Sequence, residues 1–164
     1  MRERTLWRLL YETAARANEL LALDVEDLDL ANRRALVHSK GGAVEWVFWQ
    51  TGSAQLLPRL LAGRTSGPVF LSGRRPTRAV VAGLDLDLAS GRARLSYRRA
   101  AELFRVHTGW TLHQLRHAAL THAAEDGTTC RCCWPDPATP QCAPWSASPP
   151  RPRGGRPPPR RDRP

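Results

Sequence analysis

The sequence predicts a mainly α-helical domain with a small antiparallel β-sheet, followed by a tail without regular structure. Apolar residues recur at three-and-four spacing in several segments of the first 127 residues, and two β-rich runs flank a glycine turn. All four cysteines and 11 of the 14 prolines lie after Gly127. We therefore divide the chain into a folded body, residues 1–127, and a disordered tail rich in Pro, Arg and Cys, residues 128–164.

The first elements of the body are a helix and a hairpin. Residues 4–22 place Leu and Ala on one face, which predicts a single amphipathic helix. The Asp-rich segment 23–32 ends that helix and leads into extended chain. Residues 35–39 and 43–49 are β-rich runs on either side of Lys40-Gly41-Gly42, which predicts a hairpin whose glycines form the turn. Aromatic residues of the second run are expected in the core of the sheet: Trp46, Phe48 and Trp49.

The second half of the body is expected to be helical apart from one loop-rich stretch. Residues 51–63 predict a short helix, with Thr51 or Ser53 as its N-cap and Gly63 beyond its end. Residues 64–93 are interpreted as loop-rich. Two more helices follow, at residues 95–107 and 111–127, and the second of these begins at Thr111 as N-cap and ends at Gly127.

The charge balance is strongly basic. Lys and Arg number 25 against 15 Asp and Glu, which gives a net charge of +10 and favours an anionic partner such as nucleic acid. Lys40 is the sole lysine, however, and this preference for Arg also fits a GC-rich genome. No apolar run approaches the ~20 residues of a membrane span, and no signal peptide is recognisable. We therefore expect a cytoplasmic protein without membrane contact.

Four residues suited to phosphate chemistry lie in three separate segments. Arg16 is in the first predicted helix, Lys40 is at the tip of the hairpin, and His113 and Arg116 lie one turn apart on the last helix. Guanidinium groups bind phosphate oxygens in bidentate fashion. Lys can protonate a leaving alkoxide, and His transfers protons near neutral pH. Together they suit a phosphodiester whose charge builds in a transition state, although each alone also fits an ordinary solvated residue.

At these residues the chain resembles the tyrosine recombinases, that is, the phage-integrase-type catalytic domain. The segment ARANELLAL resembles the helix of that family's first arginine, with Glu19 where the family usually has a supporting acidic residue. HSKGG resembles the hairpin that carries its lysine, and HQLRHAALTHAAEDG resembles its His-x-x-Arg helix. His117 and His122 in this helix are assigned to packing or to the surface. The resemblance covers residues 1–127, which we interpret as a partial catalytic domain.

The resemblance implies DNA integration or site-specific DNA recombination, with strand cleavage and rejoining through a phosphotyrosyl link. Arg16 and Arg116 would hold the scissile phosphate, Lys40 would protonate the leaving 5′-oxygen, and His113 would assist proton transfer. Neither a metal nor another cofactor is expected, because the arginines supply the positive charge. The implied partner is DNA, on which the family acts as an oligomer, and the implied source is a mobile element.

The nucleophile of this family is a tyrosine, and none stands at its expected place. The chain contains Tyr11, in the first-arginine helix, and Tyr97, ahead of His113. The family's third site histidine is missing as well, so we expect a catalytically dead chain. Codon arithmetic over residues 129–146 permits an apolar helix and a histidine in a shifted reading frame. We therefore interpret the chain as truncated at both ends and frameshifted after about residue 128.

Other interpretations stay open. One is a non-catalytic DNA-binding remnant or regulator, whose basic tail adds phosphate contacts. Another is a non-functional product of a decayed gene. A zinc site in the tail is disfavoured, because the spacing C-x-C-C-x8-C matches no common zinc motif and adjacent cysteines are poor tetrahedral partners. Its four candidate ligands would be Cys130, Cys132, Cys133 and Cys142.

Overall fold

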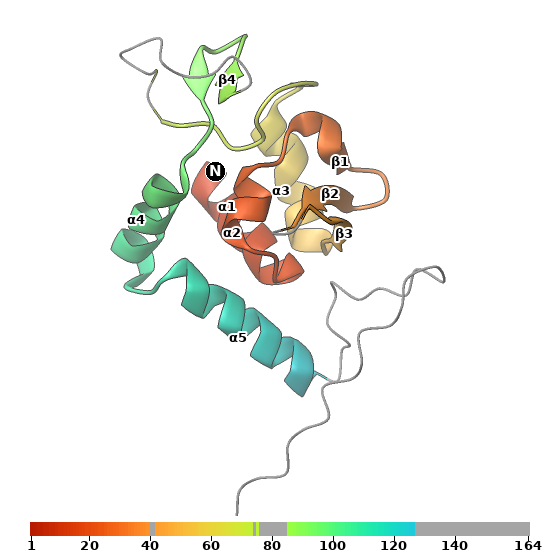
Figure 1. The fold of residues 1–164 in the computed structure, drawn as a ribbon, viewed down its shortest axis with the longest axis vertical. Coiled ribbons are helices and arrows are strands. Elements are labelled where there is room, and N and C mark those ends of the chain that lie inside the picture. Colours follow the sequence, from red (N-terminus) through yellow and green to blue (C-terminus); the bar gives the residue numbers. More distant parts are fainter. Residues whose placement is uncertain (40–41, 74, 76–84, 127–164) are drawn as a thin grey trace, which may run out of the picture.

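The computed structural model describes residues 1–39, 42–73, 75 and 85–126, and within these ranges helices pack against one side of a small three-stranded sheet (Figure 1). The α-helices are α1 (Arg2–Thr13), α2 (Ala17–Leu21), α3 (Thr51–Leu61), α4 (Tyr97–Thr108) and α5 (Leu112–Glu125). The strands are β1 (Leu28–Asp29), β2 (Arg34–His38), β3 (Val44–Phe48), β4 (Leu86–Asp87) and β5 (Arg92–Ala93). The predicted class, mainly α with a small antiparallel sheet, is confirmed. The predicted tail lies outside the described residues.

The predicted single helix over residues 4–22 is wrong, because the chain breaks between α1 and α2. Ala14 adopts a left-handed conformation with φ 50° and closes α1 with a bond from its N–H to the Leu10 carbonyl, at 3.0 Å. The buried hydroxyl of Thr13 donates to the Leu9 carbonyl and accepts from the N–H of Ala15. These bonds satisfy the end of α1 locally and let the chain turn before α2 begins.

The predicted hairpin is confirmed as the β2–β3 pair, and β1 adds a third strand beside β2. The strands pair from Arg34 with Phe48 to His38 with Val44, and Gly42 in the turn has φ +80°. Lys40 and Gly41 lie outside the described residues. The expected burial holds for Trp49, which is 5% exposed, but is wrong for Trp46, which is 40% exposed. The Arg34 guanidinium covers the outward-facing ring of Trp46 at 4.3 Å.

Helix α3 begins as predicted but not by the predicted cap. Its N-cap is Gln50, and neither Thr51 nor Ser53 caps it through a side chain. The carboxylate of Glu12 on α1 instead accepts from the backbone N–H of Gln50 at 3.0 Å and of Ser53 at 3.2 Å. Glu12 is buried and also accepts from the Arg8 guanidinium at 2.7 Å. The N-terminus of α3 is thus capped from a neighbouring helix.

The stretch predicted as loop-rich contains a short hairpin, β4–β5, and an anchoring arginine follows directly after it. Arg94, just after β5, donates to the carbonyls of Leu21, Ala22 and Leu23, at 3.2, 2.7 and 3.0 Å. It also pairs with Asp24 at 2.7 Å. These contacts supply hydrogen-bond donors to the last carbonyls of α2, which have no partner within the helix. The long loop is therefore tied to α2.

One hydrophobic core joins α1, α2, α3, α4 and the sheet. Its largest fully buried side chains include Phe70, Leu6, Leu9, Leu20 and Leu57. Helix α5 contributes little to this core, because Leu112 and Ala119 are its buried residues. It packs along α1 and α4 below the rest of the body (Figure 1). Most side chains of α5 are therefore available at the surface.

Candidate functional site

Arg16 stands at the break between α1 and α2, as the N-cap of α2 rather than inside a helix. Its backbone N–H donates to Oε2 of Glu19 at 2.8 Å, and its Nη1 donates to Oε1 of the same carboxylate at 2.9 Å. The Arg16 side chain remains 55% exposed, whereas that of Glu19 is 11% exposed. Glu19 therefore holds both the backbone and the guanidinium of Arg16, and part of the guanidinium still faces solvent.

His113 and Arg116 lie in the first turns of α5. Thr111 is the N-cap, as predicted. Its hydroxyl accepts a hydrogen bond from the backbone N–H of Gln114 at 3.2 Å, and the side-chain oxygen of Gln114 accepts one from the backbone N–H of Thr111. Asp126 is the C-cap, and Gly127 lies outside the described residues. His113 is exposed and Arg116 is half-buried, and no carboxylate of the described residues pairs with Arg116. The rigid start of α5 thus positions both side chains.

His113 contacts a second histidine, which the sequence interpretation had left to packing or the surface. The Nε2 atoms of His113 and His117 are 2.8 Å apart, and the two ring planes meet at 80°. One ring nitrogen must donate and the other accept, so at least one of these imidazoles carries a proton on Nε2. The spacing of four residues on one helix was the signal in the sequence that could have predicted this pair.

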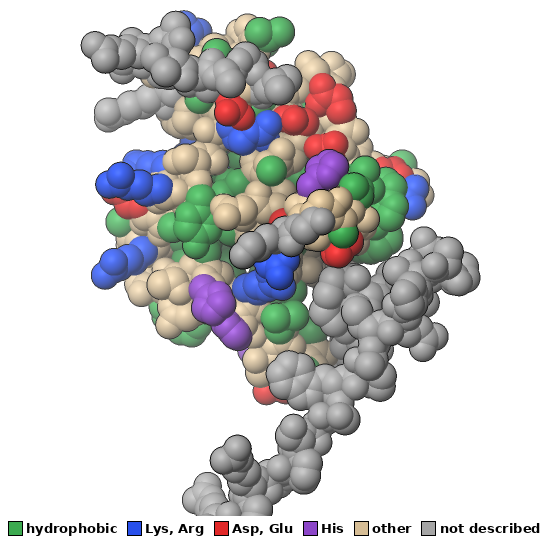
Figure 2. All heavy atoms as spheres, in the orientation of Figure 1, with side chains coloured by type: hydrophobic (Ala, Val, Ile, Leu, Met, Phe, Trp, Pro, Cys, Tyr) green, Lys and Arg blue, Asp and Glu red, His purple; other side chains and the backbone are tan. Residues whose placement is uncertain are grey.

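The elements that carry the candidate residues are packed neighbours. Helix α2 packs against both α4 and β2, and α5 packs against both α1 and α4. Arg16 therefore lies between one helix that packs against α5 and another that packs against α4 and β2. Figure 2 shows histidine side chains over the first half of α5 with basic side chains beside them, while acidic side chains gather toward the opposite end of this face.

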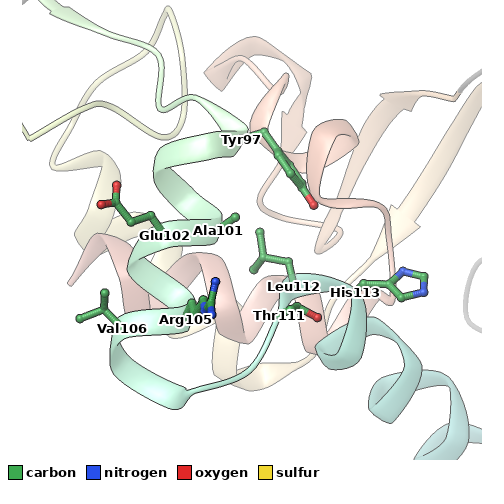
Figure 3. A pocket seen from close by; sticks show the side chains of 8 residues that line it. All are labelled: Tyr97, Ala101, Glu102, Arg105, Val106, Thr111, Leu112 and His113. Atoms are coloured by element: carbon green, nitrogen blue, oxygen red, sulfur yellow. The ribbon is translucent and has the colours of Figure 1, made fainter.

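An open pocket of about 590 Å³ lies between α4 and α5 and includes His113 in its wall. Tyr97, the first residue of α4, lines the same pocket and is 48% exposed. Figure 3 shows the ring of His113 turned away from α4, at the edge of the pocket. Arg105 and Glu102 give the opposite wall a mixed charge. The pocket thus places a phenol and an imidazole on one surface of the molecule.

The other tyrosine is engaged by α5. The hydroxyl of Tyr11 lies 2.7 Å from Nδ1 of His122, and the two rings make an edge-on contact with centroids 5.9 Å apart. Tyr11 is 37% exposed. This pair joins α1 to the second half of α5, so its evident role is to hold α5 in place.

The described part of the chain contains no group of three or more His, Cys, Asp and Glu residues that could hold a metal ion. The four cysteines of the tail, for which a zinc site was disfavoured, lie outside the described residues. In the same residues no helix is long and apolar enough to cross a membrane.

Comparison with known families identifies the family of the chain. The model of the phage integrase family matches residues 1–132, which include Arg16, His113 and Arg116. The chain belongs to the phage integrase family. The predicted resemblance to this family is therefore confirmed, over the whole of residues 1–127 on which it was based.

Curated relatives are tyrosine recombinases. Tyrosine recombinase XerD of Mycobacterium leprae is 34% identical over 137 residues, which cover 80% of this chain and 42% of the relative. Tyrosine recombinase XerC of Mycobacterium bovis is 34% identical over 138 residues, which cover 80% of this chain and 43% of the relative. This phage integrase family member therefore spans less than half the length of these relatives.

A solved structure of similar fold is the Tn1549 transposon integrase in complex with circular intermediate DNA. It aligns over 76% of this chain and 47% of the solved chain, with 20% sequence identity and a TM-score of 0.46.

Proposed function

We propose that this chain binds the DNA backbone with the phosphate-binding half of a tyrosine recombinase site. Arg16 and Arg116 would contact phosphate oxygens, His113 would donate to the same phosphate, and Lys40 would approach it from the β2–β3 hairpin. Glu19 would orient Arg16. The relatives named tyrosine recombinases support DNA as the partner.

The observation that carries this proposal is the way Glu19 holds Arg16. A guanidinium that swings freely loses conformational entropy when it binds a phosphate, and a guanidinium already fixed through one edge loses less. Glu19 takes one Nη of Arg16 at 2.9 Å and leaves the side chain 55% exposed. The free edge can then donate to a phosphate in a bidentate manner.

We infer that the chain on its own binds DNA without cleaving it. Cleavage through a phosphotyrosyl link needs a tyrosine hydroxyl in line with the phosphate. Of its two tyrosines, Tyr11 is engaged by His122 and Tyr97 stands on α4 at the pocket edge. The division of the chain into a partial catalytic domain, residues 1–127, and a tail, residues 128–164, belongs to this proposal.

The test is DNA affinity, measured by fluorescence anisotropy of a labelled duplex at several salt concentrations. Arg16→Ala should weaken binding roughly tenfold to a hundredfold, because a charge-assisted hydrogen bond contributes about 1.5–3 kcal/mol. It should also lower the salt slope by about 1, as expected for one lost phosphate contact.

Arg99→Ala is the matched control. Arg99 is 57% exposed and pairs with Glu102 three residues later at 2.7 Å, so it repeats the Arg16–Glu19 arrangement on α4. Equal losses for Arg16→Ala and Arg99→Ala would show that only net charge matters, and would refute the proposed site. A covalent DNA adduct of the wild-type chain that disappears in Tyr97→Phe would refute the absence of cleavage.

The non-catalytic regulator remains a second candidate, favoured by the five excess positive charges of residues 128–164. In that case deletion of these residues should weaken binding and reduce the salt slope. A decayed product without function would unfold without cooperativity, but the single continuous core of the described residues supports a cooperative fold.

A further inference from the structure

The imidazoles of His113 and His117 converge on one point above the surface of α5. Their Nε2 atoms are 2.8 Å apart and their ring centroids 4.3 Å apart. Both side chains are exposed, and a spacing of four residues keeps them on one face of the helix. Two ring nitrogens therefore share one proton at a position that solvent ions can reach.

We propose that His113 and His117 form a binding site for a divalent transition-metal ion, with Cu²⁺ and Ni²⁺ as the best-fitting ions. Neutral imidazole is a common ligand for these ions, and two histidines at positions i and i+4 of a helix can bind one ion together. The ion would replace the proton that the two Nε2 atoms share, once both rings rotate so that the lone pair of each Nε2 faces the ion.

The choice of Cu²⁺ and Ni²⁺ follows from the affinity of imidazole ligands for these two ions. Metal–imidazole bonds are about 2.0–2.1 Å long, so two bonds at a right angle place the nitrogens about 2.9 Å apart. A tetrahedral angle would require about 3.4 Å between them. The observed 2.8 Å is the separation of a hydrogen-bonded pair, and the rings can open from it to either value when both nitrogens turn toward one ion. By the Irving–Williams order Cu²⁺ should bind more tightly than Ni²⁺.

The site is bidentate within the described part of the chain, where no third His, Cys, Asp or Glu joins a group. Water or a carrier chelate would fill the other coordination positions. An ion on Nε2 of His113 also occupies the atom that the proposed function directs at a phosphate. This consequence depends on the proposed function, whereas metal binding itself does not.

The experiment uses the full untagged chain, with its four cysteines alkylated so that thiols do not bind metal. The probe is Ni²⁺ held on iminodiacetate resin, which leaves coordination positions open, and the readout is the imidazole concentration that elutes the protein. His113→Ala and His117→Ala should each lower that concentration several-fold, and the double variant should be no lower than either single one. Such non-additivity is the signature of two groups that bind one ion.

His38→Ala is the matched control, because it removes an exposed imidazole from strand β2. It should elute with the wild type. Equal decreases for all three single variants would show that retention follows the number of histidines, and would overturn the proposal. Calorimetric titration of the soluble chain with NiCl₂ gives a second measure, in which His117→Ala should raise the Kd at least tenfold. An unchanged Kd would also overturn it.

Discussion

Replacement of Glu12 gives the sharpest prediction for the fold. Its carboxylate, 2% exposed, accepts from the N–H groups of Gln50 and Ser53 and from the Arg8 guanidinium. Glu12→Ala removes a helix cap, worth about 1 kcal/mol, and leaves buried donors without partners, at about 1–3 kcal/mol. We expect a loss of about 2–4 kcal/mol in the free energy of unfolding. Glu12→Gln keeps one acceptor oxygen and should lose about 1–2 kcal/mol.

The assay is urea unfolding followed by tryptophan fluorescence. Glu102→Ala is the control, because that carboxylate is 59% exposed and its loss should change the free energy of unfolding by less than about 0.5 kcal/mol. If Glu12→Gln and Glu12→Ala cost the same, the carbonyl oxygen of Gln does not cap α3 and the assigned magnitudes are wrong. If neither variant differs from Glu102→Ala, the cap itself does not stabilise the fold.

Glu12 also predicts a pH dependence. Burial alone raises its pKa, but hydrogen bonds from Arg8, Ser53 and Gln50 outweigh burial and hold the pKa below its ordinary value of 4.5. A carboxyl whose pKa is lower in the folded chain stabilises that chain fully above the unfolded pKa. The stabilisation is lost as the pH falls from 4.5 through the folded pKa. Glu12→Gln should therefore flatten the decline of stability below pH 4.5, and an unchanged decline would contradict this assignment.

Three further variants test other contacts. Gly52→Ala should lower the free energy of unfolding in urea by about 1–2 kcal/mol, because the new Cβ would lie 2.6 Å from the Glu12 carboxylate, which its hydrogen bonds hold in place. This loss should exceed the gain from the higher helix propensity of alanine, and a stabilised variant would contradict the prediction. Tyr11→Phe should lower the free energy of unfolding by about 1 kcal/mol, because the hydrogen bond to His122 is lost. An unchanged free energy of unfolding would contradict this. Thr111→Ala should cost about 1 kcal/mol and speed amide hydrogen exchange in the first turn of α5, where unchanged exchange would refute the cap.

Local rules in the sequence predicted the elements better than their junctions. The Thr111 cap and the glycine-containing hairpin follow from residue types within a few positions of each other. The break at Ala14 does not, because alanine favours helix, whereas Ala14 adopts a left-handed conformation with φ 50°. The cap of α3 was equally hidden, since Glu12 lies 38 residues before Gln50.

Strand alternation could have corrected one error. Val47 is buried and Trp46 precedes it, so the two side chains must point to opposite faces of β3. The small sheet has its core on one face, and Trp46 consequently reaches the outer face beside Arg34. Hydrophobicity alone suggested that all three aromatic residues were buried. The period of the strand shows that neighbours cannot both be buried in a sheet covered on one face.

The candidate phosphate-binding residues are held by polar contacts at the ends of helices. Substitutions at these residues should therefore affect DNA binding and the stability of the fold separately. Arg16 depends on Glu19, and the far end of α2 depends on Arg94, whose guanidinium binds three successive backbone carbonyls. His113 depends on the cap at Thr111. Loss of Arg16 removes an exposed side chain and leaves these supports intact, so it should change DNA affinity with little change in unfolding. Loss of Glu12 should lower the free energy of unfolding with little change in DNA affinity, because Glu12 caps α3 and contacts no candidate phosphate ligand.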